Sequence, residues 1–446
     1  MSRTITNIIT KTITKAIVPL GAVLNQWYGA EWDTSESSPL VTRIASSTAA
    51  MDLHAVLPIQ SAMKGCLLNA DGTVNYYLKT TDWTKKANND ASDLSGTDGQ
   101  VMVEIPAYYR KFETDGNTRR IKISTYELTG YTLVPKMYIS AFEASLNRTN
   151  SKLASVVNAS ADYRGGNNNG ALDGAVNSLL GKPATSISRT NYRTYARNNG
   201  TGWQMNFYNA HKNMWWLFMV EFANRNSQSP VNATLTAEGY KQGGLGNGVT
   251  TANGTEWSNF SGYYPFVNCG ASNSLGNNSG EVDTVIADFG GAGVDRTFKV
   301  NRYRGIEMPF GHIWKNIDGI NIKIQAVADG NESQLWTADN LSDWNDSNYT
   351  NYENKGLSSR ANGYMSEALF GSDGEFVPKV ATGGSTTYYC DYFYTNLPAS
   401  GESLRTLLVG GGANDGAGAG FVFSDSRYSP SYAIALIGSR LCFLGA

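Results

Sequence analysis

The stretch FVFSDSRYSPSYAIALIGSRLCF, residues 421–443, sets large and chemically unrelated side chains among Ser, Ala and Pro spacers. A buried strand would be more uniformly apolar, and a solvent loop would carry fewer aromatic residues. Packing in the core near a C-terminal strand is the alternative interpretation. It suits Asp425 and Arg427 poorly, because buried charges need partners. The stretch therefore predicts a ligand-binding surface.

Two further patterns support a surface of this kind. Tyr432, Ile434 and Leu436 alternate with alanines, so all three would point the same way in an extended chain. Upstream, the sequence YYCDYFY at 388–394 adds a second group of aromatic residues. Tyr and Arg provide large contact areas with polar tips at modest entropic cost, which is why they are enriched in binding surfaces.

The composition of the C-terminal segment is also unusual. Residues 403–446 contain no Lys, Glu, Gln, Trp or Met, although all five types occur elsewhere in the chain. These are the amino acids whose codons end only in a purine. A segment diversified at the first two bases of Asn-type codons, with a pyrimidine fixed at the third base, would avoid all five. The pattern is consistent with diversification by adenine mutagenesis.

Residues 405–443, RTLLVGGGANDGAGAGFVFSDSRYSPSYAIALIGSRLCF, resemble the variable repeat of proteins diversified by retroelements, and 437–443 match its invariant end. The resemblance implies a ligand-binding face with the variable side chains exposed on it. The implied face residues are Gly412, Asp415, Gly418, Phe421, Phe423, Asp425, Arg427, Tyr428, Tyr432, Ile434 and Leu436, joined by Tyr389, Asp391, Tyr392 and Tyr394.

The same region resembles the formylglycine-generating-enzyme type of C-type lectin fold. YRGIEMPFGHIWKNIDG at 303–319 is similar to an internal segment of that fold, and PKMYISAFEA at 135–144 is similar to its opening strand. The resemblance implies an α+β fold, with a C-type lectin-like domain over 126–446 that carries long irregular insertions. Its variable repeat would span about 405–443.

The remainder of the chain is expected to form two smaller parts. Residues 1–40 carry isoleucines at helical spacing and predict a helical attachment or oligomerisation segment. Residues 41–125 predict a small β-rich accessory domain, with a hairpin at Asp71-Gly72 and a second turn at ETDGNT, 113–118. Within the third part, Met214 to Val220 is apolar all round, which indicates a buried helix.

Charge and motifs exclude several classes of function. The chain has 446 residues and a net charge of -2, so we expect no nucleic-acid partner, which would need a basic face. Lysines interrupt the apolar N-terminal residues, so we expect neither a secretion signal nor a membrane span. The glycine-rich run 410–420 lacks the Lys-Ser/Thr of a phosphate loop.

Candidates for chemistry are few. The three histidines stand alone, and the four cysteines lack metal-ligand spacing, so structural roles are favoured for both. Residues 343–354, DWNDSNYTNYEN, offer oxygen ligands but depart from the calcium-hand pattern. A solvated loop is favoured there, and an irregular structural calcium site is the alternative. We expect no other cofactor and no enzymatic activity.

The resemblance implies a receptor-binding protein of a phage tail tip or fibre, located on the virion. Its expected partners are a bacterial cell-surface receptor, either protein or glycan, other tail proteins, and further copies of itself in a homo-oligomer, a trimer. Two alternatives stay open. One is a bacterial surface adhesin with the same diversified fold. The less favoured one is a formylglycine-generating-type oxidase, for which Cys390 and Cys442 show no matching motif.

Overall fold

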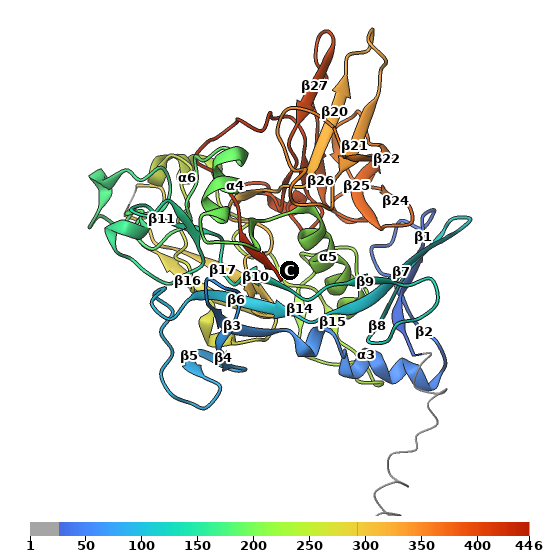
Figure 1. The fold of residues 1–446 in the computed structure, drawn as a ribbon, viewed down its shortest axis with the longest axis horizontal. Coiled ribbons are helices and arrows are strands. Elements are labelled where there is room, and N and C mark those ends of the chain that lie inside the picture. The colour runs from blue at the N-terminus through green and yellow to red at the C-terminus, as the bar shows by residue number, and fades with distance from the viewer. Residues whose placement is uncertain (1–25, 292, 446) are drawn as a thin grey trace, which may run out of the picture.

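The computed structural model describes residues 26–291 and 293–445 as a β-rich fold of many small sheets (Figure 1). Strands make up 34% of the chain and helices 13%. The fold class expected with a lectin-like domain, a small β-rich domain and a helical N-terminal segment, α+β, is therefore wrong, because the described residues form a β-rich fold. Residues 1–25, which carry the isoleucine pattern, lie outside the described residues, and Tyr28–Asp33 within the predicted segment is a strand.

The reason for the difference is that the described residues form only one long helix. The α-helices within residues 26–291 and 293–445 are α3 (Leu53–Val56), α4 (Arg189–Arg197), α5 (Tyr208–Phe222) and α6 (Gly254–Ser261). The segments between them are rich in Gly, Asn and Ser, which favour turns and short strands over helix.

The largest sheet joins strands from distant parts of the chain. Its seven strands, in spatial order, are β13 (Trp203–Met205), β31 (Leu441–Leu444), β10 (Met137–Ser140), β6 (Gln100–Ile105), β3 (Lys64–Leu68), β4 (Val74–Lys79) and β5 (Asp82–Lys86). β31 pairs with β10, so that Tyr138 faces Phe443, and β10 also pairs with β6. This sheet therefore contains strands from both sides of the predicted boundary at residue 125.

A second sheet lies beside α5 and contains the hairpin expected at ETDGNT (Figure 1). Its strands, in spatial order, are β2 (Thr42–Ala45), β1 (Tyr28–Asp33), β8 (Thr118–Ser124), β7 (Tyr108–Asp115) and β9 (Thr132–Val134). The hairpin predicted at Asp71-Gly72 is also confirmed, since it connects β3 and β4 and places Gly72 at φ +82°. Glycine tolerates that left-handed conformation without steric cost.

Helix α5 forms the centre of the main hydrophobic core. Every residue from Met214 to Val220 is at most 1% exposed, which confirms the predicted buried helix. Trp216 contacts Trp32 of β1, and Phe218 packs against Phe421 of the C-terminal stretch with ring centroids 5.1 Å apart. The helix therefore packs against elements from both ends of the described chain.

Two sheets of short strands hold the C-terminal third of the chain (Figure 1, orange to red). The six-stranded sheet runs β23 (Gly363–Tyr364), β26 (Tyr392–Tyr394), β29 (Ser424–Asp425), β28 (Leu408–Val409), β19 (Trp314–Asn316) and β30 (Ile437–Gly438). The four-stranded sheet runs β22 (Glu353–Leu357), β21 (Ser333–Thr337), β20 (Ile320–Gln325) and β27 (Glu402–Arg405).

The other strands form a three-stranded sheet and three hairpin-like pairs. The three-stranded sheet is β16 (Gly280–Ile286), β17 (Arg296–Tyr303) and β18 (Ile306–Glu307), and the pairs are β11 (Ser145–Asn147) with β12 (Lys152–Ala154), β14 (Val231–Asn232) with β15 (Gln242–Gly243), and β24 (Glu367–Phe370) with β25 (Glu375–Val380).

A buried charge cluster connects the two largest sheets. The Glu143 carboxylate lies 2.8 Å from Lys315 Nζ and 2.6 Å from His312 Nδ1, and all three side chains are at most 3% exposed. His312 Nε2 accepts the backbone N–H of Phe266, at 3.1 Å, so Nδ1 carries the proton that Glu143 accepts. Arg440 completes the cluster from β30–β31 by donating to the carbonyls of Ser140, Glu307 and Met308.

The balance of burial and charge keeps Glu143 ionised. Burial disfavours the carboxylate, but the Lys315 ammonium and the hydrogen bond from His312 outweigh that effect and lower the pKa of Glu143 to about 2. The three segments 135–144, 303–319 and 405–443 meet at this carboxylate.

We predict that Glu143→Gln lowers the free energy of unfolding by about 3–5 kcal/mol, because it leaves the buried Lys315 ammonium without its counter-ion. Urea denaturation measures the change. Glu113→Gln is the matched control, since Glu113 pairs with two lysines at a partly exposed hairpin and its removal should cost under about 1 kcal/mol. Equal losses in the two variants would contradict a special role for Glu143.

Candidate ligand-binding face

Large, half-buried side chains gather on the six-stranded sheet. They pack on a small buried cluster formed by Trp314, Leu408, Phe423 and Ile437. We call this surface the aromatic face and define it by eight residues: Tyr364, Tyr392, Tyr394, Arg427, Tyr428, Tyr432, Ile434 and Leu436. None of the eight is fully buried, so each presents part of its surface to solvent.

The tyrosines of the face touch one another in two groups. Tyr364 of β23 meets Tyr392 of β26 edge to face at 4.9 Å, and Tyr392 meets Tyr394 at 4.5 Å. Tyr428 and Tyr432 stack with their ring planes 5° apart and their centroids 4.1 Å apart. Aromatic pairs at such distances stabilise one another beyond the area they bury. The rings therefore hold one another in position.

Arg427 joins the two groups. Its guanidinium lies 4.2 Å from the ring centroid of Tyr394 and 5.2 Å from that of Tyr428. It also makes a bidentate ion pair with the buried carboxylate of Asp425, and the shorter contact, between Nη2 and Oδ2, is 2.6 Å long. Burial disfavours the arginine charge, but the hydrogen bonds to Asp425 outweigh it and raise the pKa of Arg427. The charge at the centre of the face is thus neutralised internally.

A second carboxylate lies at the edge of the face. Asp415 accepts hydrogen bonds from Trp314 Nε1 at 2.6 Å and from the backbone N–H of Gly412 at 2.7 Å. Burial raises the pKa of Asp415, although both hydrogen bonds oppose that shift. Asp415 therefore fixes the glycine-rich turn against the indole of Trp314.

Beneath the face, Asp391 holds the backbone of the C-terminal stretch. Its Oδ2 accepts the N–H groups of Val422, at 2.8 Å, and Phe423, at 3.1 Å. Its Oδ1 is buried and has no hydrogen-bond partner among the described residues. A Cβ on Gly420 would lie 2.0 Å from that oxygen, so only glycine fits there. Burial raises the pKa of Asp391 well above its usual value.

The structure divides the predicted face residues into two sets. The half-buried set on or beside the face is Asp415, Tyr392, Tyr394, Arg427, Tyr428, Tyr432, Ile434 and Leu436. The buried set beneath it is Gly412, Gly418, Phe421, Phe423, Asp425, Tyr389 and Asp391. Residues 431–436 are not a strand, yet Tyr432, Ile434 and Leu436 all pack on the same cluster. The role of either set in binding stays a prediction.

The buried set belongs to the scaffold for a clear reason. Phe421 and Tyr389 contact Trp215 of α5, in the main core. The backbone carbonyl of Phe421 also lies 2.6 Å from His211 Nε2. Because α5 is far away in sequence, local composition could not separate these aromatic residues from those of the face.

One residue of the face, Tyr364, and one residue of the cluster beneath it, Trp314, were missed from the sequence. Tyr364 reaches the face because β23 pairs with β26, which places Tyr364 opposite Tyr392. Trp314 reaches the cluster from β19, between β28 and β30. Neither residue lies in a motif that indicates binding, so no sequence signal could have found them.

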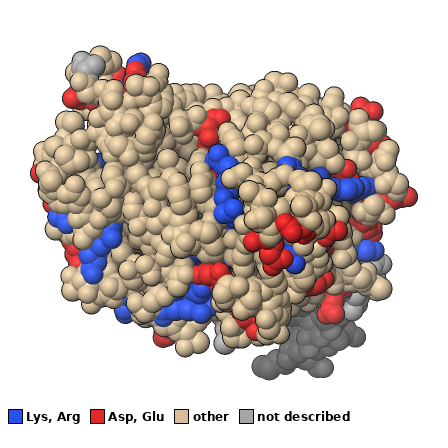
Figure 2. All heavy atoms as spheres, turned by 90° about the horizontal axis from the view of Figure 1, so that it is seen from above, with Lys and Arg blue, Asp and Glu red and all other residues tan. Residues whose placement is uncertain are grey.

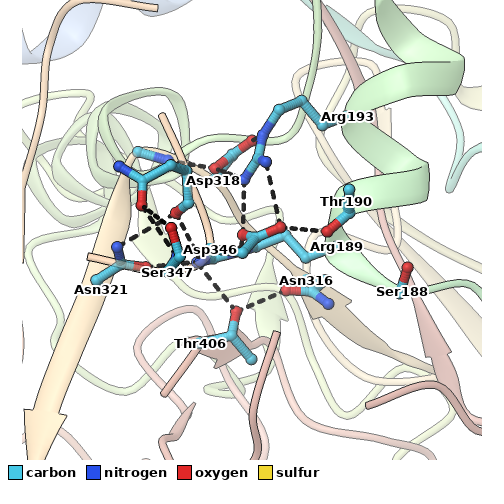
Figure 3. A network of polar contacts seen from close by, with 12 residues as sticks. Ser188, Arg189, Thr190, Arg193, Asn316, Asp318, Asn321, Asp346, Ser347 and Thr406 are labelled. Carbon is cyan, nitrogen blue, oxygen red and sulfur yellow. Dashed lines mark hydrogen bonds and ion pairs between the residues drawn. The ribbon is translucent and has the colours of Figure 1, made fainter. Parts of the chain in front are cut away.

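The loop predicted to be solvated or to bind calcium is docked onto α4 by ion pairs (Figure 3). Asp346 lies 2.7 Å from Arg189 Nε and 2.8 Å from Arg193 Nη2, and Arg193 also pairs with the buried Asp318. Burial opposes ionisation of Asp346, but Arg189 and Arg193 outweigh it and lower its pKa to about 2. In the described part of the chain, no group of three His, Cys, Asp or Glu residues is placed to hold a metal.

The histidines and cysteines are buried. Burial lowers the pKa of His54 and of His211 to about 4, which favours neutral imidazoles. Burial likewise raises the pKa of Cys66, Cys390 and Cys442 to about 12, so these thiols stay protonated near neutral pH.

The molecular surface carries no large patch of one sign in the view of Figure 2, where basic and acidic groups lie close together among uncharged residues. Within residues 26–291 and 293–445, no helix is long and apolar enough to cross a membrane. No protein-family model matches the chain, and no curated protein matches it.

Asp391 should give the protein a recognisable dependence on pH. A carboxyl whose pKa is raised in the folded state binds more protons folded than unfolded, so stability falls as the pH rises above its unfolded pKa of about 4. We predict that Asp391→Asn matches wild type near pH 4 and becomes the more stable of the two as the pH rises. Thermal or urea unfolding from pH 4 to 8 measures this difference.

Asp391→Ala is the control for the two hydrogen bonds. It removes both acceptors at every pH and should cost about 1–3 kcal/mol throughout. Parallel stability profiles for wild type and Asp391→Asn would show that the carboxyl is not held neutral.

Proposed function

We propose that this protein is a receptor-binding protein of a phage tail tip or fibre, whose aromatic face contacts a ligand on the surface of a bacterial host. One observation carries the proposal. Large, half-buried side chains from the segments around 364, 392–394 and 427–436 gather on one sheet, and the Arg427 charge at their centre is paired with Asp425. Such a surface has the composition of known binding surfaces, in which Tyr, Trp and Arg dominate the affinity.

The scaffold beneath the face supports diversification of its side chains. Asp391 and Arg440 hold the backbone of the C-terminal stretch through groups that lie outside the face. Because these anchors hold the backbone, the side chains at 428, 432, 434 and 436 can change at the cost of their own packing contacts.

The ligand class and the assembly follow from the same proposal. The Arg427–Asp425 pair leaves the centre of the face electrically neutral, which suits a protein or glycan ligand bound through stacking and hydroxyl groups. A homo-oligomer, a trimer, would present several faces at once and raise the apparent affinity by linkage. Other tail proteins would attach it to the virion.

Binding to cells tests the role of the face. We expect fluorescently labelled protein to bind at least one strain in a panel of bacterial isolates, measured by flow cytometry. Tyr432→Ala removes the stacking partner of Tyr428 and should weaken that binding by roughly 30-fold or more, as for a hot-spot residue.

Tyr109→Ala is the matched control, because Tyr109 is a half-buried tyrosine on β7, in a different sheet. It should leave binding unchanged. Equal losses in both variants, or binding to none of the strains, would contradict the proposal.

Deep sequencing of the gene and its flanks tests diversification. We expect an Asn-rich near-copy of residues 405–443 nearby, a reverse transcriptase gene, and adenine-linked variation in a growing population. Functional variants should change at Tyr428, Tyr432, Ile434 and Leu436. They should keep the buried Phe421 and the ion pair of Arg427 with the buried Asp425. A single invariant sequence without a template copy would contradict diversification and would indicate a face that binds one fixed ligand. Neighbouring genes for surface anchoring, in place of tail genes, would indicate the bacterial adhesin.

A further inference from the structure

A cleft of about 410 Å³ lies between the segment 176–182 and the strand β16. Its volume falls within the range of about 300–1,000 Å³ that is typical of small-molecule sites. Val176 and Val285 on its walls are 58% and 61% exposed, so apolar surface is open to an occupant. Lys182 and Asn268 supply polar groups to the same cleft.

Lys182 is unusual among the lysines of this protein. It is only 6% exposed, and its Nζ donates to the backbone carbonyl of Ser178. Among the residues that the structure describes, no carboxylate lies within ion-pairing distance of it, whereas the buried lysines Lys212 and Lys315 each face a glutamate. Since an ammonium has three donors and a buried charge needs a partner, Lys182 has unused binding capacity.

Among the described residues that line the cleft, Lys182 is the one charged group without an oppositely charged partner. Asp283 is the other titratable residue lining it, and its carboxylate pairs with Lys299 across β16 and β17, at 3.2 Å. The exposed Asn268 side chain makes no hydrogen bond to any described residue, so its amide is available beside the lysine. A second cleft, of about 250 Å³, is lined by Glu221 and Arg304. There the Glu221 carboxylate already pairs with the Arg304 guanidinium, so neither charge lacks a partner.

We infer that this cleft binds a small organic anion, whose carboxylate or phosphate group rests on Lys182 and Asn268 and whose body packs on Val176 and Val285. The site shares no residue with the aromatic face, so it is independent of the proposed receptor contact. Burial lowers the pKa of Lys182 to about 8. The negative charge of a bound anion would favour the ammonium form and so oppose that shift. A ligand of this kind therefore gains from the unpaired amine without disturbing the ion pairs around it.

Isothermal titration calorimetry on the full chain at pH 7 tests the inference. The probes are glucose 6-phosphate and glucuronate as the two anionic sugars, glucose as the neutral control, and inorganic phosphate as the anion without an organic body. We expect at least one anionic sugar to bind, glucose not to bind, and inorganic phosphate to bind more weakly than the anionic sugar.

Substitution of the lysine identifies the site. Lys182→Met and Lys182→Gln should each weaken binding of the anionic sugar roughly tenfold or more, because a charged hydrogen bond is lost. Lys379→Met, at an exposed lysine that pairs with Glu367, is the matched control and should bind as wild type does. The melting temperature of each variant checks that it folds.

The pH dependence separates this lysine from other cations. Binding requires the ammonium form, so the affinity of wild type should fall between pH 7 and pH 9.5, as Lys182 loses its proton. Lys182→Arg keeps its charge and should hold its affinity over that range. Absence of binding by both anionic sugars, unchanged affinity in folded Lys182→Met, or inorganic phosphate binding as tightly as the anionic sugar would overturn the inference.

Discussion

The buried carboxylate of Glu143 is the interaction on which the rest of this fold depends. It lies against Lys315 and His312, while Arg440 binds the carbonyls beside it, so segments far apart in the sequence meet at one point. A charge in the core is stable only when its partners are in place. The cluster therefore stabilises the arrangement in which β31 lies in the seven-stranded sheet and β19 in the six-stranded sheet.

This constraint explains how a mixed surface can sit on an ordered backbone. The C-terminal stretch is held by Arg440 at one end and by Asp391 near its start, and neither contact uses a side chain of the aromatic face. Tyr428, Tyr432 and Arg427 are consequently positioned by their neighbours and by the sheet beneath them. A binding surface that is ordered before its ligand arrives loses less conformational entropy on binding.

Local patterns predicted much of the local structure. The apolar run at 214–220 predicted α5, and the turn residues at 71–72 and 113–118 predicted two hairpins, because short-range packing and backbone preference decide such elements. The fold class was wrong because it depends on how many short strands find partners across the chain. Tyr364 could not be assigned to the face for the same reason, since only its pairing with β26 brings it there.

The C-terminal stretch shows which properties local sequence predicts and which depend on tertiary packing. Its composition alone determined that large aromatic and charged residues alternate with small spacers over residues 421–436. Which of them face solvent was decided only by packing against α5, which takes Phe421 and Tyr389 into the core and leaves Tyr428 and Tyr432 half exposed. The physical reason is that burial depends on contacts between residues about 200 positions apart in sequence. A local sequence pattern does not show which distant residues will be in contact.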